Sequence, residues 1–163
     1  MPEEHGPPLH ALRIFIAGIM QGSHVGAVIH HQGYRQRLAA LLTDAFPHAE
    51  IYDPLADHQQ SLTYEDDLAR QVFFHHIRLC SEVDVVVAYL PEASLGTAIE
   101  MWEARRHGRR VLTISPLKHN WAVKFLSDQV YGDLEEFAAA LAAGRVQRLL
   151  WPEEGSRTQD VET

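Results

Sequence analysis

The chain has 163 residues, of which 46% are hydrophobic and 22% are charged, and it carries a formal net charge of -8. A chain of this length suits one domain around a single hydrophobic core, which excludes a multidomain enzyme. No apolar run approaches the roughly 18 residues that span a bilayer, and the acidic balance excludes the basic surface that binds a nucleic-acid polymer. We therefore expect a globular protein with a small-molecule partner, and neither a membrane nor a nucleic-acid polymer as partner.

The two ends of the chain differ from its middle. Residues 1–8 and 152–163 are rich in proline, glycine and acidic side chains and show no hydrophobic period, so we expect flexible tails around one domain at 9–151. The single cysteine, Cys80, excludes an internal disulfide, and the N-terminus lacks the basic and apolar regions of a secretory signal. These features predict a cytoplasmic protein.

Short apolar runs alternate with helical patterns between the tails, which is typical of βαβ units and a parallel sheet. In chain order, the predicted elements are a strand at 13–17, a helix at 34–45, a strand at 50–53, a helix at 64–81, a strand at 84–90, a helix at 95–107, a strand at 111–115, a helix after Pro116, a strand at 129–131 and a helix at 133–143. The sequence thus predicts an α/β fold with a five-stranded parallel sheet.

Ligands of such sheets bind beyond the carboxyl ends of the strands. The turn after the first strand is neither a dinucleotide-binding glycine fingerprint nor a P-loop. Its glycines permit a ligand to come close to the backbone, so Gly18, Met20, Gln21 and Gly22 are candidate substrate-binding residues. An ordinary strand-to-helix turn is the alternative.

The turn after the third strand is the most informative segment. Ser94 suits the N-cap of the helix that follows, where free backbone amides point towards a ligand. The hydroxyls of Ser94 and Thr97 complete a small site for a phosphate or carboxylate, and Gly96 leaves room for the ligand.

Glu100 follows Ser94 and Thr97 at intervals of three residues, so all three lie near one row of the helix. Because helical side chains lean towards the N-terminus, the Glu100 carboxyl is expected to point at the ligand. The helix dipole should hold it ionised, which suits a nucleophile or an electrostatic stabiliser better than a proton donor. A solvated helix glutamate like Glu103 is the alternative.

The strand 84–90 (DVVVAYL), the segment 94–100 (SLGTAIE) and the segment 108–112 (GRRVL) resemble the nucleoside 2-deoxyribosyltransferase superfamily, and within it the 2'-deoxynucleoside 5'-monophosphate N-hydrolases. The similarity extends over most of the folded chain. It implies a flavodoxin-like or Rossmann-like three-layer sandwich and an enzyme that cleaves the N-glycosidic bond of a nucleoside or (deoxy)nucleoside 5'-monophosphate. Glu100 takes the position of the family's nucleophile, and Ser94 that of the hydrolases' phosphate-binding serine.

Three positions depart from the family pattern. Phe15 replaces a hydroxyphenyl group, Gln21 replaces a basic residue, and His76 replaces an acid. His76 lies on the inward face of its predicted helix, where it is either a packed histidine or an imidazolium that donates a proton to the departing base. Transfer to an acceptor base, and nucleotide binding without turnover, therefore remain alternatives to hydrolysis.

The eleven histidines do not form a metal motif, because His30-His31 and His75-His76 are adjacent pairs with diverging side chains. We expect neither a metal nor a cofactor.

A single small chain offers a crevice open to water, so we expect a homo-oligomer, a dimer or tetramer, that closes the site. The resemblance implies that a polar side chain after the fourth strand crosses into the partner's pocket. Asn120 is the candidate for that residue, and Ser127 is the alternative. Trp121 and Phe125 add apolar surface to the same segment.

Overall fold

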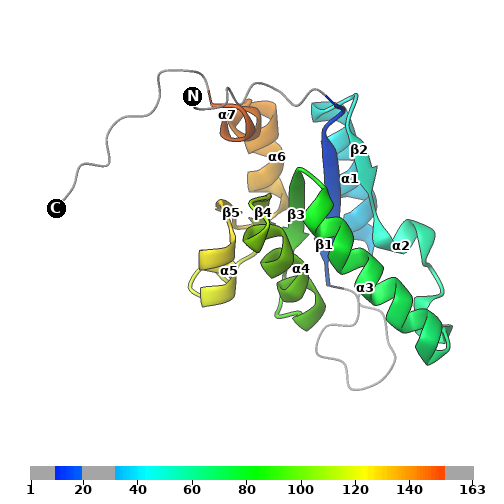
Figure 1. Ribbon diagram of the computed structural model, residues 1–163. Helices are drawn as coiled ribbons and strands as arrows, with labels where there is room; N and C mark the ends of the chain where they lie inside the picture. The colour runs from blue at the N-terminus through cyan, green and yellow to red at the C-terminus, as the bar shows by residue number, and fades with distance from the viewer. Residues whose placement is uncertain (1–9, 20–31, 153–163) are drawn as a thin grey trace, which may run out of the picture.

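The computed structural model describes residues 10–19 and 32–152. Its five strands form one parallel sheet in the order β2-β1-β3-β4-β5 (Figure 1). The strands are β1 (Arg13–Gly18), β2 (Glu50–Tyr52), β3 (Val85–Tyr89), β4 (Arg110–Ile114) and β5 (Gln129–Tyr131). Each lies within one residue of its predicted bounds, so the predicted α/β class with a five-stranded parallel sheet is confirmed.

Several predictions fall outside the described residues. These are the N-terminal tail at 1–8, the C-terminal tail apart from Pro152, and the candidate binding residues Met20, Gln21 and Gly22.

The main predicted helices are present, together with short ones that were not predicted. The helical segments are α1 (Gly33–Ala45), α2 (Pro54–Asp57), the 3-10 turn η1 (Ser61–Thr63), α3 (Asp66–Glu82), α4 (Leu95–Arg106), α5 (Trp121–Leu126), α6 (Leu134–Ala142) and α7 (Arg145–Leu150). Gly108 and Gly144 have φ values of 70° and 69°, the left-handed conformation that favours glycine after a helix, as expected at both positions. Among the described residues, no helix has the length and apolar character needed to cross a membrane.

The sheet is buried on both faces because alternate strand residues point to opposite sides. On one face, Ile14 and Ile16 belong to a core cluster that includes buried side chains of α1, α6 and α7. On the other face, Phe15 and Ala17 belong to a cluster that includes buried side chains of α3, α4 and α5. The result is a three-layer sandwich (Figure 1).

The order of the strands defines where a ligand site is expected. The chain places β2 on one side of β1 and β3 on the other, so the direction of winding reverses between β1 and β3. Ligands of open parallel sheets bind at the carboxyl ends of the strands beside such a switch point. Gly18 of β1 is in register with Tyr89 of β3 at this point, and α4 begins shortly after β3.

Candidate active site

At the end of β1, Gly18 is required by the packing of a tyrosine. A Cβ atom added to Gly18 would lie 2.2 Å from Oη of Tyr34. The Tyr34 hydroxyl donates a hydrogen bond to the carbonyl of Ile19 (3.2 Å), and its ring stacks on Tyr89 with centroids 4.1 Å apart. The tyrosine therefore fills the space over Gly18, whose predicted contact with a ligand stays a prediction.

Arg35 is a buried charge at this end of the sheet that the sequence analysis missed. Its side chain is only 2% exposed, and Nη1 donates to the Ile16 carbonyl (3.2 Å) and to Oδ1 of Asp53 (2.9 Å). Nη2 donates to the Gly18 carbonyl (3.1 Å), and Nε donates to Oε1 of Gln32 (2.7 Å). Four hydrogen bonds thus fix the guanidinium, two of them to backbone carbonyls of β1 and two to the side chains of Asp53 and Gln32.

A sequence signal for Arg35 does exist. It precedes the buried Leu38 and Leu42 by three and seven positions, so it shares the apolar face of α1. A permanently charged side chain on such a face is rare unless it is paired.

Ser94 caps α4 as predicted. Its Oγ accepts hydrogen bonds from the backbone amide of Thr97 (3.4 Å) and from the Thr97 hydroxyl (3.0 Å). Because Ser94 accepts both bonds, its own O–H remains able to donate to a ligand. Thr97 is buried and points its hydroxyl at Ser94, so it supports that side chain. A Cβ atom at Gly96 would meet nothing within 4 Å, which agrees with open space at this position.

The electrostatics of Glu100 differ from the sequence expectation. Burial raises the pKa of its carboxyl to about 8, and the positive charge of Arg35 opposes part of that rise. The expectation that the helix dipole holds Glu100 ionised is therefore wrong for the free protein at neutral pH, because desolvation outweighs the dipole. Glu103, three residues on, is hydrogen-bonded to Arg106, which lowers the pKa of its carboxyl. The two glutamates consequently occupy different environments.

His76 lies on α3 among aromatic rings. Its ring centroid is 5.2 Å from that of His58, 5.9 Å from Tyr52 and 6.3 Å from Phe15. Burial, and then the charge of His58, lower the pKa of His76 to about 4. The neutral imidazole excludes the interpretation of His76 as an imidazolium at neutral pH. Its Nε2 is buried and finds no hydrogen-bond partner among the described residues, so it is not a satisfied packed histidine either.

Electrostatic coupling links several of these side chains. The charge of Arg35 lowers the pKa of both Glu100 and His76. The charge of Glu100 in turn raises the pKa of Tyr34, although burial is the main cause of that rise. Residues from α1, α3 and α4 are thus near enough to affect one another's pKa values.

Asn120 has a local structural role. Its Oδ1 accepts hydrogen bonds from the backbone amides of Ala122 (3.0 Å) and Val123 (3.3 Å), so it caps α5. The alternative, Ser127, is bound to the Thr113 hydroxyl (2.6 Å) and to the Val123 carbonyl (2.5 Å). Of the two, Asn120 is the exposed residue.

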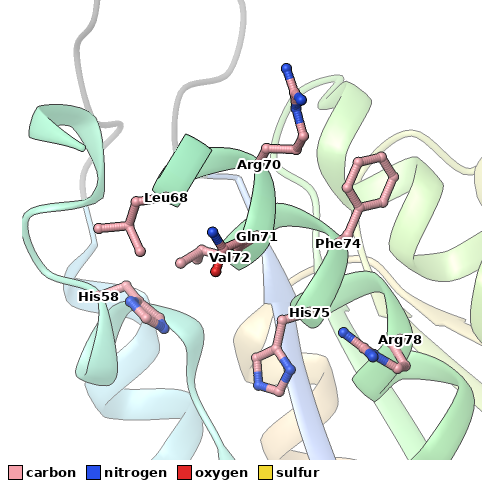
Figure 2. Close-up of a pocket in the computed structure, with 8 residues that line it drawn as sticks. All are labelled: His58, Leu68, Arg70, Gln71, Val72, Phe74, His75 and Arg78. Atoms are coloured by element: carbon pink, nitrogen blue, oxygen red, sulfur yellow. The ribbon is translucent and has the colours of Figure 1, made fainter. Parts of the chain in front are cut away.

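Two open pockets are lined in part by Arg35 and by the histidines next to His76. One, of about 560 Å³, is lined by His58, Leu68, Arg70, Gln71, Val72, Phe74, His75 and Arg78. Figure 2 shows Leu68 and Val72 pointing towards His58, whereas Arg70 and Phe74 point away from it. The other, of about 540 Å³, is lined by Gln32, Gly33, Arg35, Gln36, Asp53, Leu55, Ala56 and Gln59. Within residues 10–19 and 32–152, no three histidine, cysteine or carboxylate side chains are arranged to hold a metal ion.

Exposed apolar side chains lie on α4 and α5, two helices that pack against each other. These side chains, which we call the α4–α5 face, are Leu95, Ile99, Trp102, Trp121 and Phe125. Leu95 is 87% exposed and Trp121 is 77% exposed, so Trp121 is not a core residue.

Comparison with known proteins establishes the fold. No protein-family model and no curated protein matches the sequence. The structure resembles a 2-deoxyribosyltransferase from Bacillus psychrosaccharolyticus, with a TM-score of 0.59 and 14% identity over 79% of this chain and 95% of that chain. It also resembles a conserved protein from Enterococcus faecalis V583, with a TM-score of 0.58 and 16% identity over 82% and 98% of the two chains.

A third similar structure is the CMP N-glycosidase BcmB of Clostridium botulinum, with a TM-score of 0.49 and 17% identity over 80% of this chain and 98% of that chain. The two structures with TM-scores of 0.59 and 0.58 confirm the fold that the resemblance in the sequence implied.

Proposed function

We propose that this protein is an N-glycosidase that hydrolyses the bond between base and sugar in a nucleoside or (deoxy)nucleoside 5'-monophosphate, with Glu100 as the nucleophile. The observation that carries the proposal is the desolvated carboxyl of Glu100, which lies on the helix that Ser94 caps at the sheet's switch point. The fold supports it, because a 2-deoxyribosyltransferase shares the architecture.

In the proposed reaction, ionised Glu100 attacks the anomeric carbon while the carbon–nitrogen bond breaks and its electron pair leaves with the base. Water then attacks the glycosyl-enzyme: its oxygen stays on the sugar as a hydroxyl group, its other proton goes to the departed base, and the carboxylate of Glu100 is regenerated. A desolvated carboxylate is a stronger nucleophile than a hydrated one, but it must first lose its proton. We therefore expect kcat/KM to rise with pH through about 8, the pKa of Glu100 in the free protein.

Two other side chains have proposed roles in substrate binding. Ser94 donates its hydroxyl hydrogen to the 5' end of the substrate, beside the free amides of the first turn of α4. His76, being neutral, offers the departing base one N–H donor and one acceptor nitrogen in place of a proton.

Base transfer is the second candidate, favoured by the similarity to a 2-deoxyribosyltransferase. Binding without turnover is the third, favoured by the replacement of the family's acid with a neutral histidine. Adding an acceptor base to the reaction distinguishes transfer from hydrolysis, because only transfer yields a new nucleoside.

The test is incubation of the protein with a panel of nucleosides and nucleoside monophosphates at several pH values, with and without a second base, and chromatography of the products. Glu100→Gln should abolish base release, whereas Glu103→Gln, on the same helix, should retain it. Full activity in Glu100→Gln would contradict the nucleophile assignment. Ligand binding without release by the wild type would favour the third candidate.

We also propose that the working unit is a homo-oligomer, a dimer or tetramer, formed through the α4–α5 face. Exposed apolar patches of this kind mark interaction sites, and a self-complementary patch suits a two-fold axis. Asn120 lies at the start of α5, beside Trp121, from where its amide group would reach a partner subunit's site.

A further inference from the structure

Nε2 of His76 is a buried polar atom that has no hydrogen-bond partner among the described residues. Such atoms are rare in folded proteins, because the hydrogen bond to water that burial removes is not replaced. A phenylalanine would pack among the same rings without that cost. Nε2 is therefore suited to a bond with the departing base, and such a bond requires that the ring be held in one orientation.

Among the described residues, the ring of His76 has three edge-to-face neighbours outside its own helix. Two of them, Phe15 of β1 and Tyr52 of β2, have centroids 6.3 and 5.9 Å away. Their rings are stacked on each other at 5.5 Å, and the pairing of the two strands fixes them. The third and nearest is His58, at 5.2 Å and an interplanar angle of 62°, and it lies at the end of α2, outside the sheet. Contacts other than strand pairing must therefore hold His58 in place.

Tyr64 supplies the main contact that holds His58. Nδ1 of His58 and the hydroxyl of Tyr64 share a hydrogen bond of 3.0 Å, and the two rings meet edge to face with centroids 5.9 Å apart. The backbone amide of His58 also donates to the carbonyl of Pro54 (3.1 Å). Leu68 and Val72 of α3 point towards the His58 ring (Figure 2). Side-chain and main-chain contacts thus fix the ring of His58 beside His76.

The orientation of the His76 ring determines which of its atoms meets the base. A histidine ring that turns by half a turn exchanges nitrogen for carbon, because Nε2 changes places with Cε1 and Nδ1 with Cδ2. The turned ring would present a C–H group where the held ring presents a nitrogen. Because His58 makes the nearest of the three ring contacts, it opposes this turn.

We propose that His58 and Tyr64 are a positioning pair for His76: their hydrogen bond holds the His58 ring against His76, which keeps Nε2 of His76 directed at the departing base. The inference deepens the proposed function, and its part about the base rests on that function. Neither His58 nor Tyr64 needs to touch the substrate, so both act through His76 alone.

The first measurement is the orientation of the His76 ring in the free protein, from nuclear Overhauser contacts of its two ring protons with Phe15 and Tyr52. A held ring gives different contacts for the two protons, and a ring that turns gives the same averaged contacts for both. The wild type should show the first pattern. Tyr64→Phe, which removes only the hydroxyl, and His58→Ala, which removes the ring, should both show averaged contacts.

The second measurement is kcat/KM for base release, with the panel of nucleosides and nucleoside monophosphates described above. His58→Ala should lower it about tenfold, the effect of one lost hydrogen bond to the base. Tyr64→Phe should lower it less, and His58→Phe, which keeps a ring beside His76, should recover most of the loss. In a His76→Phe background none of these changes should lower kcat/KM further, because the residue through which they act is gone.

His48→Ala is the matched control, since it removes an exposed histidine after α1 and should change neither the contacts of His76 nor kcat/KM. If His58→Ala does not fold, Tyr64→Phe still tests the proposal, because it keeps the whole ring of Tyr64. Unchanged contacts of His76 in every folded variant would overturn the proposal. Averaged contacts without a loss of kcat/KM, or an equal loss in the His76→Phe background, would overturn it as well.

The two measurements separate this inference from the proposed function. If the contacts average as expected but the wild type releases base from no member of the panel, the glycosidase assignment fails and the positioning of the His76 ring stands. If the wild type releases base and the His58 and Tyr64 variants keep both the contacts and kcat/KM, the inference fails and the glycosidase assignment stands.

Discussion

Glu100 and Glu103 lie three residues apart on α4, and the pKa values of their carboxyls shift in opposite directions. The difference comes from the neighbours that the fold supplies. Glu103 has Arg106 within hydrogen-bonding distance. Glu100 is desolvated, and the rise in its pKa is opposed in part by the charge of Arg35, which is itself paired with Asp53. A helix dipole alone is a weaker influence than burial.

This difference predicts a pH-dependent change in stability for Glu100→Gln. The pKa of Glu100 is about 8 in the folded protein, against the ordinary value of 4.5. Between these two pH values the folded state therefore keeps a proton that the unfolded state has lost. The wild type therefore loses stability as pH rises from 4.5 to about 8. The variant lacks this loss, and its melting temperature should exceed that of the wild type by a few degrees at pH 8.

Thermal unfolding of both proteins across this pH range is the measurement. The difference in melting temperature should vanish near pH 4.5 and grow steadily towards pH 8. A constant difference would mean that Glu100 is solvated. Glu103→Gln is the control, and it should not stabilise the protein at pH 8, because the pKa of Glu103 is lowered.

At the scale of the element, a substitution in the first turn of α4 should change substrate binding without lowering the stability of the protein. Gly96→Ala adds a methyl group where nothing lies within 4 Å, and alanine favours a helix by up to about 1 kcal/mol over glycine. The melting temperature should stay equal or rise. If the open space admits the substrate, KM for a nucleoside or monophosphate should rise about tenfold, the effect of a loss of about 1.4 kcal/mol of binding. Unchanged KM would place the substrate elsewhere.

The elements that the sequence predicted have either a hydrophobic pattern or residues that mark their ends. The strands β1, β3 and β4 and the helices α1, α3 and α6 have such patterns, whereas α4 was predicted from Ser94 and Gly108, which mark its ends by residue type. The short α2 and α7 were missed, because four to six residues are too few for a period. The pKa shifts of Glu100 and His76 were not predicted, because burial is their main cause and burial depends on elements that meet only in three dimensions.

At the scale of the whole molecule, the α4–α5 face makes assembly testable. Trp121→Glu puts a charge on the most exposed aromatic residue of that face without touching the core, so it should turn an oligomer into monomers while the far-ultraviolet circular dichroism stays unchanged. Light scattering at micromolar concentration measures the mass. Asp44→Lys, a charge change at an exposed position of α1 on the other side of the sheet, is the control. A monomeric wild type with full activity would contradict the proposed assembly.

The pairing of β1 with β3 brings together segments far apart in the chain. Ile14 is in register with Val85, and the hydrogen bond from the Arg13 amide to Asp84 spans 71 positions. By contrast, β3 and β4 are joined through α4 alone. Contacts between distant segments require closure of a long loop and form slowly, so we expect β3, α4 and β4 to associate early in folding and β1 to dock late. The candidate site lies between β1 and the part formed by β3, α4 and β4. A ligand that occupies it therefore stabilises only chains in which β1 has docked, and it does not stabilise a partly folded intermediate.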